Sequence, residues 1–230
     1  MTPHGATDGG LRLTGVALSL AGRRLFRPLT VHVPPGEVVT VMGPSGSGKS
    51  SLLALICGTL EPAFAAEGSV SVDGRSLDGL PPERRGVGIL FQDDLLFPHL
   101  TVGENLAFAL PAAVRGRAER ARRIADALAE ADLAGFEGRA PETLSGGQRT
   151  RAALMRTLMA GPRVLLLDEP FARLDRPLRA RMRRFVFDHA RCRGLPILLV
   201  THDPEDAEAA GGPVIDLDAP FDPEPPDTAG

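Results

Sequence analysis

Residues 38–55 read VVTVM, GPSGSGKS and SLLAL: a β-branched run, a glycine-rich loop and a run of helix-forming apolar residues. The pattern predicts a strand, a turn and a helix, which is the order in which a G-x-x-x-x-G-K-S loop binds phosphate. Its glycines let successive backbone N–H groups point at phosphate oxygens, and the helix N-terminus adds its positive dipole end. We therefore expect a nucleoside triphosphate to bind at Gly43, Pro44, Ser45, Gly46, Ser47, Gly48, Lys49 and Ser50.

The loop contains the only lysine of the chain, Lys49, among 26 basic residues. Arginine presents a wide planar fork, whereas lysine is a compact charge on a flexible stem, so the two are not interchangeable where phosphate oxygens crowd together. We expect the Lys49 ammonium to reach the β- and γ-phosphates. The Ser50 hydroxyl is expected to ligate Mg²⁺.

A second motif, VLLLDEP at residues 164–170, is an apolar strand that ends in two carboxylates. Ligands of α/β sheets bind at the carboxyl ends of the strands, so this end should face the phosphate loop. Asp168 is then suited to hold the metal ion, directly or through water. Glu169 can position a water molecule for attack on the γ-phosphate.

The composition limits the protein class. A chain of 230 residues and 24.3 kDa has room for one large domain, and its net charge of −3 gives no basic footprint for nucleic acid. No apolar run approaches the roughly 18 residues of a membrane span, and residues 1–10 lack the apolar core of a signal peptide. Two cysteines, Cys57 and Cys192, can form neither a disulfide framework nor a zinc site.

Short apolar runs alternate with helical patterns, which predicts an α/β domain over residues 11–218 between disordered ends at 1–10 and 219–230. Strands are expected at 11–18, 38–42, 69–73, 87–91, 164–167, 197–201 and 214–217. Helices are expected over 114–133 and from a cap at Ser145 to Gly161. Because no strand is expected between 91 and 164, an α-helical subdomain at about 95–160 should be inserted into a parallel-sheet core.

The pentapeptide LSGGQ at residues 144–148 lies between the two motifs. With them it resembles the ATP-binding cassette ATPases, the motor subunits of ABC transporters, over residues 11–204. The resemblance implies a P-loop NTPase core with a RecA-like, parallel-sheet-rich subdomain and an N-terminal antiparallel β subdomain. It also implies a head-to-tail dimer with a second copy of the chain, in which Ser145, Gly146, Gly147 and Gln148 close over the γ-phosphate bound by the partner's Lys49 loop.

The same resemblance assigns roles to other positions. Gln92 matches the glutamine that senses Mg²⁺ and links hydrolysis to the transmembrane partner, and Asp175 matches a loop that crosses between the two sites. His202 matches the histidine that contacts the γ-phosphate and supports Glu169. The family usually stacks the adenine on an aromatic ring at the place of Leu20. Phe26 is the nearest ring in the sequence, but its place in the family pattern packs inward.

Residues 88–105 and 170–175 are most similar to bacterial importer ATPases of the thiamine, iron, sulfate and polyamine group, the thiamine type above all. This implies transmembrane permease subunits as partners, with a periplasmic or surface solute-binding protein acting indirectly, at the cytoplasmic face of the inner membrane. We expect three departures from the group: absence of the C-terminal regulatory barrel that many members carry, one short strand after Gly211-Gly212-Pro213 in place of a terminal hairpin, and a charge at Arg173 where a small or polar residue is usual.

Two other functions compete with import. A soluble cassette ATPase acting on DNA or ribosomes would carry coiled-coil insertions, zinc cysteines or two cassettes, and the sequence has none of these. An exporter or lipoprotein-extracting ATPase is the second alternative, against which the LFPH segment at residues 96–99 argues. We therefore expect an importer ATPase with ATP and Mg²⁺ as cofactors and with no nucleic-acid partner.

Overall fold

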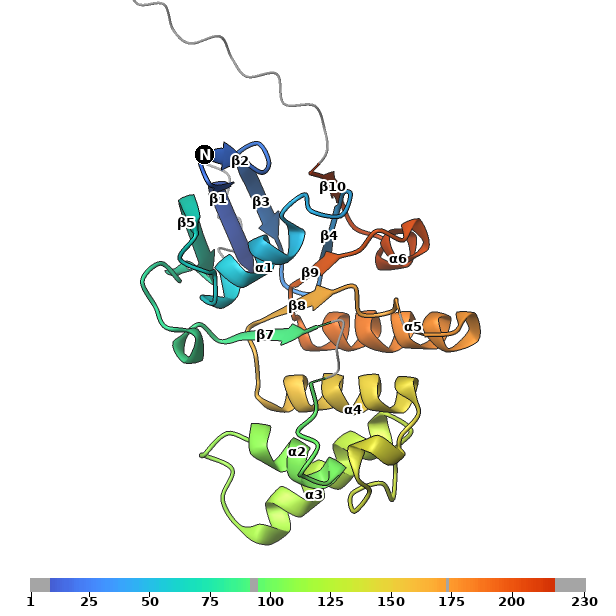
Figure 1. Ribbon diagram of the computed structural model, residues 1–230. Coiled ribbons are helices and arrows are strands. Elements are labelled where there is room, and N and C mark those ends of the chain that lie inside the picture. Colours follow the sequence, from blue (N-terminus) through green and yellow to red (C-terminus); the bar gives the residue numbers. More distant parts are fainter. Residues whose placement is uncertain (1–8, 92–94, 173, 218–230) are drawn as a thin grey trace, which may run out of the picture.

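The computed structural model describes residues 9–91, 95–172 and 174–217, which form two sheets and a helical lobe (Figure 1). The first sheet is antiparallel, with strand order β2-β1-β5-β6 and with β3 paired to β1. Its strands are β1 (Leu11–Leu20), β2 (Arg23–Arg24), β3 (Leu29–Val33), β5 (Phe64–Val72) and β6 (Arg75–Ser76). This sheet is the expected antiparallel β subdomain.

The second sheet is parallel throughout and has the order β10-β4-β9-β8-β7. Its strands are β4 (Val38–Met42), β7 (Val87–Leu90), β8 (Val164–Asp168), β9 (Ile197–Val200) and β10 (Val214–Asp216). Consecutive apolar residues of β8 are buried on opposite faces: Val164 and Leu166 belong to one core and Leu165 and Leu167 to the other. The predicted parallel-sheet core is therefore confirmed.

Helix α1 (Lys49–Cys57) packs in the core between the antiparallel sheet and one face of the parallel sheet. On the other face, α5 (Arg176–Arg193) and α4 (Gly146–Met159) share a core with the strands. The first core fixes the phosphate loop against the antiparallel sheet, because α1 follows that loop directly.

Helices α2 (Val102–Ala109) and α3 (Arg117–Glu130) join α4 in the lobe farthest from the antiparallel sheet (Figure 1). Thr101 and Glu104 form a capping box that starts α2, and the buried Asn105 amide donates to the carbonyls of Phe97, Leu100 and Thr101. Short 3₁₀ turns occur at Pro82–Arg84 and Pro141–Thr143. A further helix, α6 (Pro204–Ala210), follows β9.

Several boundaries differ from the prediction. Strand β5 begins at Phe64 rather than at residue 69, the helix predicted over 114–133 spans Arg117–Glu130, and α4 ends at Met159. The early half of β5 was missed because its residues are mostly exposed and do not alternate in polarity. Strand β3 was also missed, although LTVHV alternates as a half-buried strand does.

Both expected disordered ends lie mainly outside the described residues. Gly10 is within them and donates its backbone N–H to Asp73 Oδ1 at 2.8 Å. The remaining boundaries of the expected domain division stay predictions. Among the helices of the described ranges, none combines the length and the apolar character that a membrane crossing requires.

Candidate functional site

The glycine-rich loop connects β4 to α1 and wraps around the Lys49 side chain. The Lys49 ammonium donates to the carbonyl oxygens of Gly43 at 2.8 Å and Pro44 at 2.7 Å, and the residue is only 8% exposed. Helix α1 starts after Gly48 without a side-chain cap, so its first N–H groups are not satisfied by a capping side chain. The Ser47 hydroxyl is buried and has no hydrogen-bond partner. A buried cation, an uncapped helix start and an unpartnered hydroxyl suit a phosphate chain.

Two glycines of this loop are required by close packing. A Cβ at Gly48 would lie 3.0 Å from the Phe26 ring and 3.2 Å from Leu25 Cδ1, and a Cβ at Gly43 would lie 2.9 Å from Ser47 Oγ. Both backbones also have positive φ, 93° and 147°, which L side chains rarely adopt. Phe26 is 4% exposed and lies behind the loop. The inward packing expected for Phe26 is therefore observed.

Asp168 ends β8 close to the loop. Burial raises the pKa of its carboxyl, and the negative charge of Glu169 adds to the rise, whereas a hydrogen bond from Ser50 and the charge of Lys49 act in the opposite direction. The structure thus brings Ser50, Lys49 and Asp168 together. An oxygen pair from a hydroxyl and a carboxylate fits Mg²⁺, which usually takes one or two protein ligands beside phosphate oxygens and water.

Glu169, the residue between Asp168 and Pro170, has a strained backbone with φ 46°. A non-glycine residue in this region costs on the order of 1–3 kcal/mol and is common at functional sites. The backbone N–H of Glu169 donates to Val200 O at 2.9 Å, which ties it to the end of β9. Its Oε1 atom lies 3.0 Å from Nδ1 of His202, the second residue after that strand. Glu169 and His202, two of the side chains predicted to take part in catalysis, are therefore in contact.

One cavity of about 720 Å³ opens onto Lys49, Ser50, Glu169 and His202. Its lining is formed by the phosphate loop, by Ser51, by Glu169 and His202, and by Leu20, Leu25 and Phe64 of the antiparallel sheet and its turn. The lining thus combines cationic and hydrogen-bonding groups with an apolar wall. A cavity of this size and composition suits a nucleotide.

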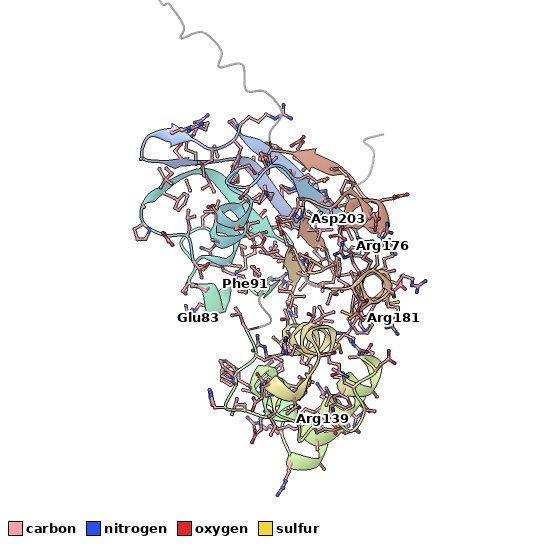
Figure 2. The ribbon with its side chains drawn as sticks, turned by 45° about the vertical axis from the view of Figure 1, so that its right-hand side comes forward. Glu83, Phe91, Arg139, Arg176, Arg181 and Asp203 are labelled. Atoms are coloured by element: carbon pink, nitrogen blue, oxygen red, sulfur yellow. The ribbon has the colours of Figure 1, made fainter. Side chains whose placement is uncertain are left out.

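A network of charged residues holds the segment that carries His202. Arg183 of α5 donates from Nε to Asp206 Oδ1 at 2.6 Å, and the Thr201 hydroxyl donates to Asp206 Oδ2 at 2.8 Å. Arg179 binds Asp203 Oδ2 at 2.7 Å and Leu174 O at 3.2 Å. Figure 2 shows Arg176 and Asp203 on the same side of the molecule, where α5 meets the segment after β9. This network links the residues on both sides of His202 to α5.

Burial would lower the pKa of Arg183, but its hydrogen bonds to Asp206 and Glu205, together with the negative charges of Asp206 and Asp203, outweigh burial and raise it. Asp206 is 2% exposed and Arg183 is 7% exposed. Such a pair is costly to break, because removing one partner leaves a buried charge.

The LSGGQ residues do not line the cavity of their own chain. Ser145 caps α4 in a capping box with Gln148: its hydroxyl accepts from Gln148 N at 3.3 Å, and Gln148 Oε1 accepts from Ser145 N at 2.9 Å. Gly147 lies against α5, where an added Cβ would clash with the Leu178 side chain. Ser145 is exposed at this helix start, so a surface outside the subunit can reach it.

The remaining predicted residues are placed in different ways. Asp175 caps α5 through a bond from Leu178 N to its Oδ1 at 2.9 Å, and it lies outside the cavity lining. Gln92 and Arg173 lie outside the described residues. Phe91, the last described residue before Gln92, is 42% exposed and follows β7 (Figure 2).

Three features of the site were missed in the sequence. Phe64 lines the cavity, but the residues AAEG that follow it do not alternate in polarity and do not indicate a strand. Leu25 also lines the cavity, and predicting this would have required knowledge of how the chain turns after β2. The ion pairs that Arg179 and Arg183 form with the segment after β9 were the third. The i, i+4 spacing of these arginines, which places them on one face of a helix, is the signal that could have indicated them.

The chain is similar to known proteins of one family. Residues 26–172 match the family described as ABC transporter. The chain is 45% identical over 199 residues to YnjD of Escherichia coli K12, an uncharacterized ABC transporter ATP-binding protein, covering 86% of this chain and 91% of that one. It is 50% identical over 172 residues to the thiamine import ATP-binding protein ThiQ of Cereibacter sphaeroides, covering 75% and 73%. The chain spans only about half to three-fifths of the polyamine and iron import proteins that it matches.

Among solved structures, the fold matches the cassette MJ0796, described as a bacterial ABC transporter cassette. Its dimeric structure shares 31% identity and a TM-score of 0.76, with 90% of this chain and 94% of that chain covered. A second dimeric structure of MJ0796, in a post-hydrolysis state bound to ADP and Pi, gives 30% identity and the same TM-score and coverage.

Proposed function

Because this chain belongs to the ABC transporter family, we propose that it is the ATP-binding and ATP-hydrolysing subunit of an importer. The observation that carries the proposal is the contact of Glu169 with His202 at the cavity that also contains the Lys49 loop. Nucleotide binding and a general base are thereby combined in one site. The proposal extends to Mg²⁺, to a head-to-tail dimer and to permease subunits.

Each residue of the site has a separate role in the reaction. The loop amides and Lys49 bind the phosphate chain, and Lys49 offsets the charge that develops on its outer oxygens. Glu169 orients the attacking water and accepts its proton, because its carboxylate is reachable from the cavity. His202 hydrogen-bonds Glu169 and restricts the carboxylate to one orientation. The network around Asp206 fixes His202 in turn.

Mg²⁺ would be held by Ser50, Asp168 and, by resemblance, Gln92. When bound, the ion neutralises charge on the β- and γ-phosphate oxygens. The hydrogen bond between Ser50 and Asp168 supports this assignment, since both oxygens then lie beside the Lys49 loop. Ionisation of Asp168 is favoured by a cation, which opposes the effect of burial.

The dimer accounts for the position of LSGGQ. Ser145, Gly146, Gly147 and Gln148 stand at the start of a helix, whose N-terminus attracts anions, yet they do not line the cavity that contains the Lys49 loop. A second copy placed head to tail would bring these residues to the γ-phosphate bound at the partner's loop. Asp175 would then lie where the two sites adjoin.

Import is supported by the thiamine-import relative and by the importer-like segments at residues 88–105 and 170–175. The chain would bind permease subunits at the cytoplasmic face of the inner membrane, with a solute-binding protein on the opposite side. The solute is most simply of the thiamine type, although membrane subunits and binding proteins, rather than the cassette, select it.

The test is purification of a tagged chain from detergent-solubilised membranes of native cells. We expect multi-spanning permease subunits to copurify and, after reconstitution into liposomes, ATP hydrolysis that a loaded solute-binding protein stimulates. Copurification with ribosomes or DNA would contradict transport. Stimulation by a solute supplied only on the nucleotide side would indicate an exporter.

A further inference from the structure

The cavity has an apolar wall that the phosphate chemistry does not use. After the phosphate loop, Ser51, Glu169 and His202 are set aside, the lining that remains consists of Leu20, Leu25 and Phe64. The phosphates bind at Lys49, and the γ-phosphate must lie within reach of Glu169. The opposite end of the nucleotide, its base, therefore extends toward these three side chains.

The chain has ten phenylalanines and no tyrosine or tryptophan, and among the phenylalanines that the structure describes only Phe64 lines this cavity. Leu20 and Phe64 are directly opposite each other in the antiparallel pairing of β1 with β5, so their side chains lie on one face of the sheet. Leu20 is 39% exposed and Phe64 is half-buried. Phe26 is buried behind Gly48 and does not line the cavity.

We propose that Phe64 supplies the aromatic surface against which the nucleobase packs, with Leu20 beside it on the neighbouring strand. The family resemblance expects this ring at Leu20 of β1; here it would be supplied from the paired strand β5, by Phe64. The inference rests on the proposed nucleotide function. Stacking on a ring accepts any base, because every base has a π face, so Phe64 adds affinity more than selectivity.

The test compares two probes by titration calorimetry on the purified chain: MgADP, and Mg-pyrophosphate, which has no base. Phe64→Ala should weaken MgADP binding about three- to tenfold and leave pyrophosphate affinity unchanged. Phe64→Trp should bind MgADP at least as tightly as the wild type. The exchange Leu20→Phe with Phe64→Leu should restore MgADP affinity to within about twofold, because the ring returns from the opposite strand.

Two control variants separate this role from general effects. Phe108→Ala removes a ring that is 70% exposed on α2 and should change neither probe. Phe26→Leu should lower stability and change both probes together, because that ring supports the loop rather than the base. If Phe64→Ala folds poorly, Phe64→Leu provides the same comparison with less loss of volume.

Unchanged MgADP affinity in Phe64→Ala, or an equal loss for both probes, would overturn the inference while leaving nucleotide binding intact. Failure of the wild-type chain to bind either probe would instead contradict the proposed function itself.

Discussion

Nδ1 of His202 lies 3.0 Å from Oε1 of Glu169, although Glu169 follows β8 and His202 follows β9, two different strands of the parallel sheet. The contact depends on two local features. Glu169 is turned back by its positive φ, and its backbone N–H is bonded to Val200 at the end of β9. The side chains of both residues are thereby directed to the cavity above the phosphate loop.

The Arg183–Asp206 pair should be a large contributor to stability at this end of the molecule. Arg183→Met leaves the buried Asp206 carboxylate without its guanidinium and should cost about 3–5 kcal/mol in urea unfolding. The double variant Arg183→Met with Asp206→Leu should recover much of the loss. Arg122→Ala, which removes an exposed pair with Glu119, is the control and should change the unfolding free energy little, because solvent screens an exposed pair. Equal losses of unfolding free energy in the single and the double variant would argue against a penalty for burying an unpaired charge.

Asp168→Asn should stabilise the nucleotide-free protein at neutral pH. Burial raises the pKa of Asp168 above its unfolded value, so its favourable contribution is complete at low pH and is lost as the pH rises from about 4 through the raised pKa. The difference in unfolding free energy, variant minus wild type, should therefore grow over this window. The same variant should lose on the order of tenfold in Mg²⁺-dependent ATP affinity, the scale of a 1.4 kcal/mol loss. A difference in unfolding free energy that does not change with pH would contradict this account of Asp168.

Composite sites can be tested by mixing inactive subunits. Ser145→Arg should abolish hydrolysis without weakening ATP binding at the phosphate loop of the same chain, since Ser145 does not line that cavity. Lys49→Ala should abolish both. Mixtures of the two variants should recover part of the activity, because one of the two sites in a mixed dimer is intact. Absence of recovery at every ratio would count against sites that work independently.

Base selectivity should be low. The cavity offers apolar contacts from Leu20 and Phe64 rather than hydrogen bonds specific to adenine. GTP should therefore be hydrolysed within about tenfold of ATP, a difference of no more than roughly 1.4 kcal/mol. Leu20→Tyr should tighten ATP binding by adding a second ring. A preference for ATP well above tenfold, measured as kcat/KM for the two nucleotides, would place the base elsewhere.

The sequence predicts the parts of this site that are contiguous in the chain. The phosphate loop, the apolar strand before Asp168 and the capping serine of LSGGQ each depend on neighbouring residues, and local patterns reveal them. Phe64 could not be found in this way, because its partner Leu20 is set by the register of two strands far apart in sequence. The Arg183–Asp206 pair likewise depends on how α5 packs beside α6. Tertiary packing, rather than local preference, determines those contacts.

The measurement that tests the central claim most directly is single-turnover hydrolysis combined with sedimentation of the Glu169→Gln variant. ATP binding depends on the loop and Lys49, and metal binding on Ser50 and Asp168, so the variant should bind MgATP and sediment as a dimer. Hydrolysis should fall by at least about a hundredfold, because general-base assistance typically contributes 10²–10⁴ in rate. Single-turnover hydrolysis near the wild-type rate, or a variant that stays monomeric with MgATP bound, would contradict the account.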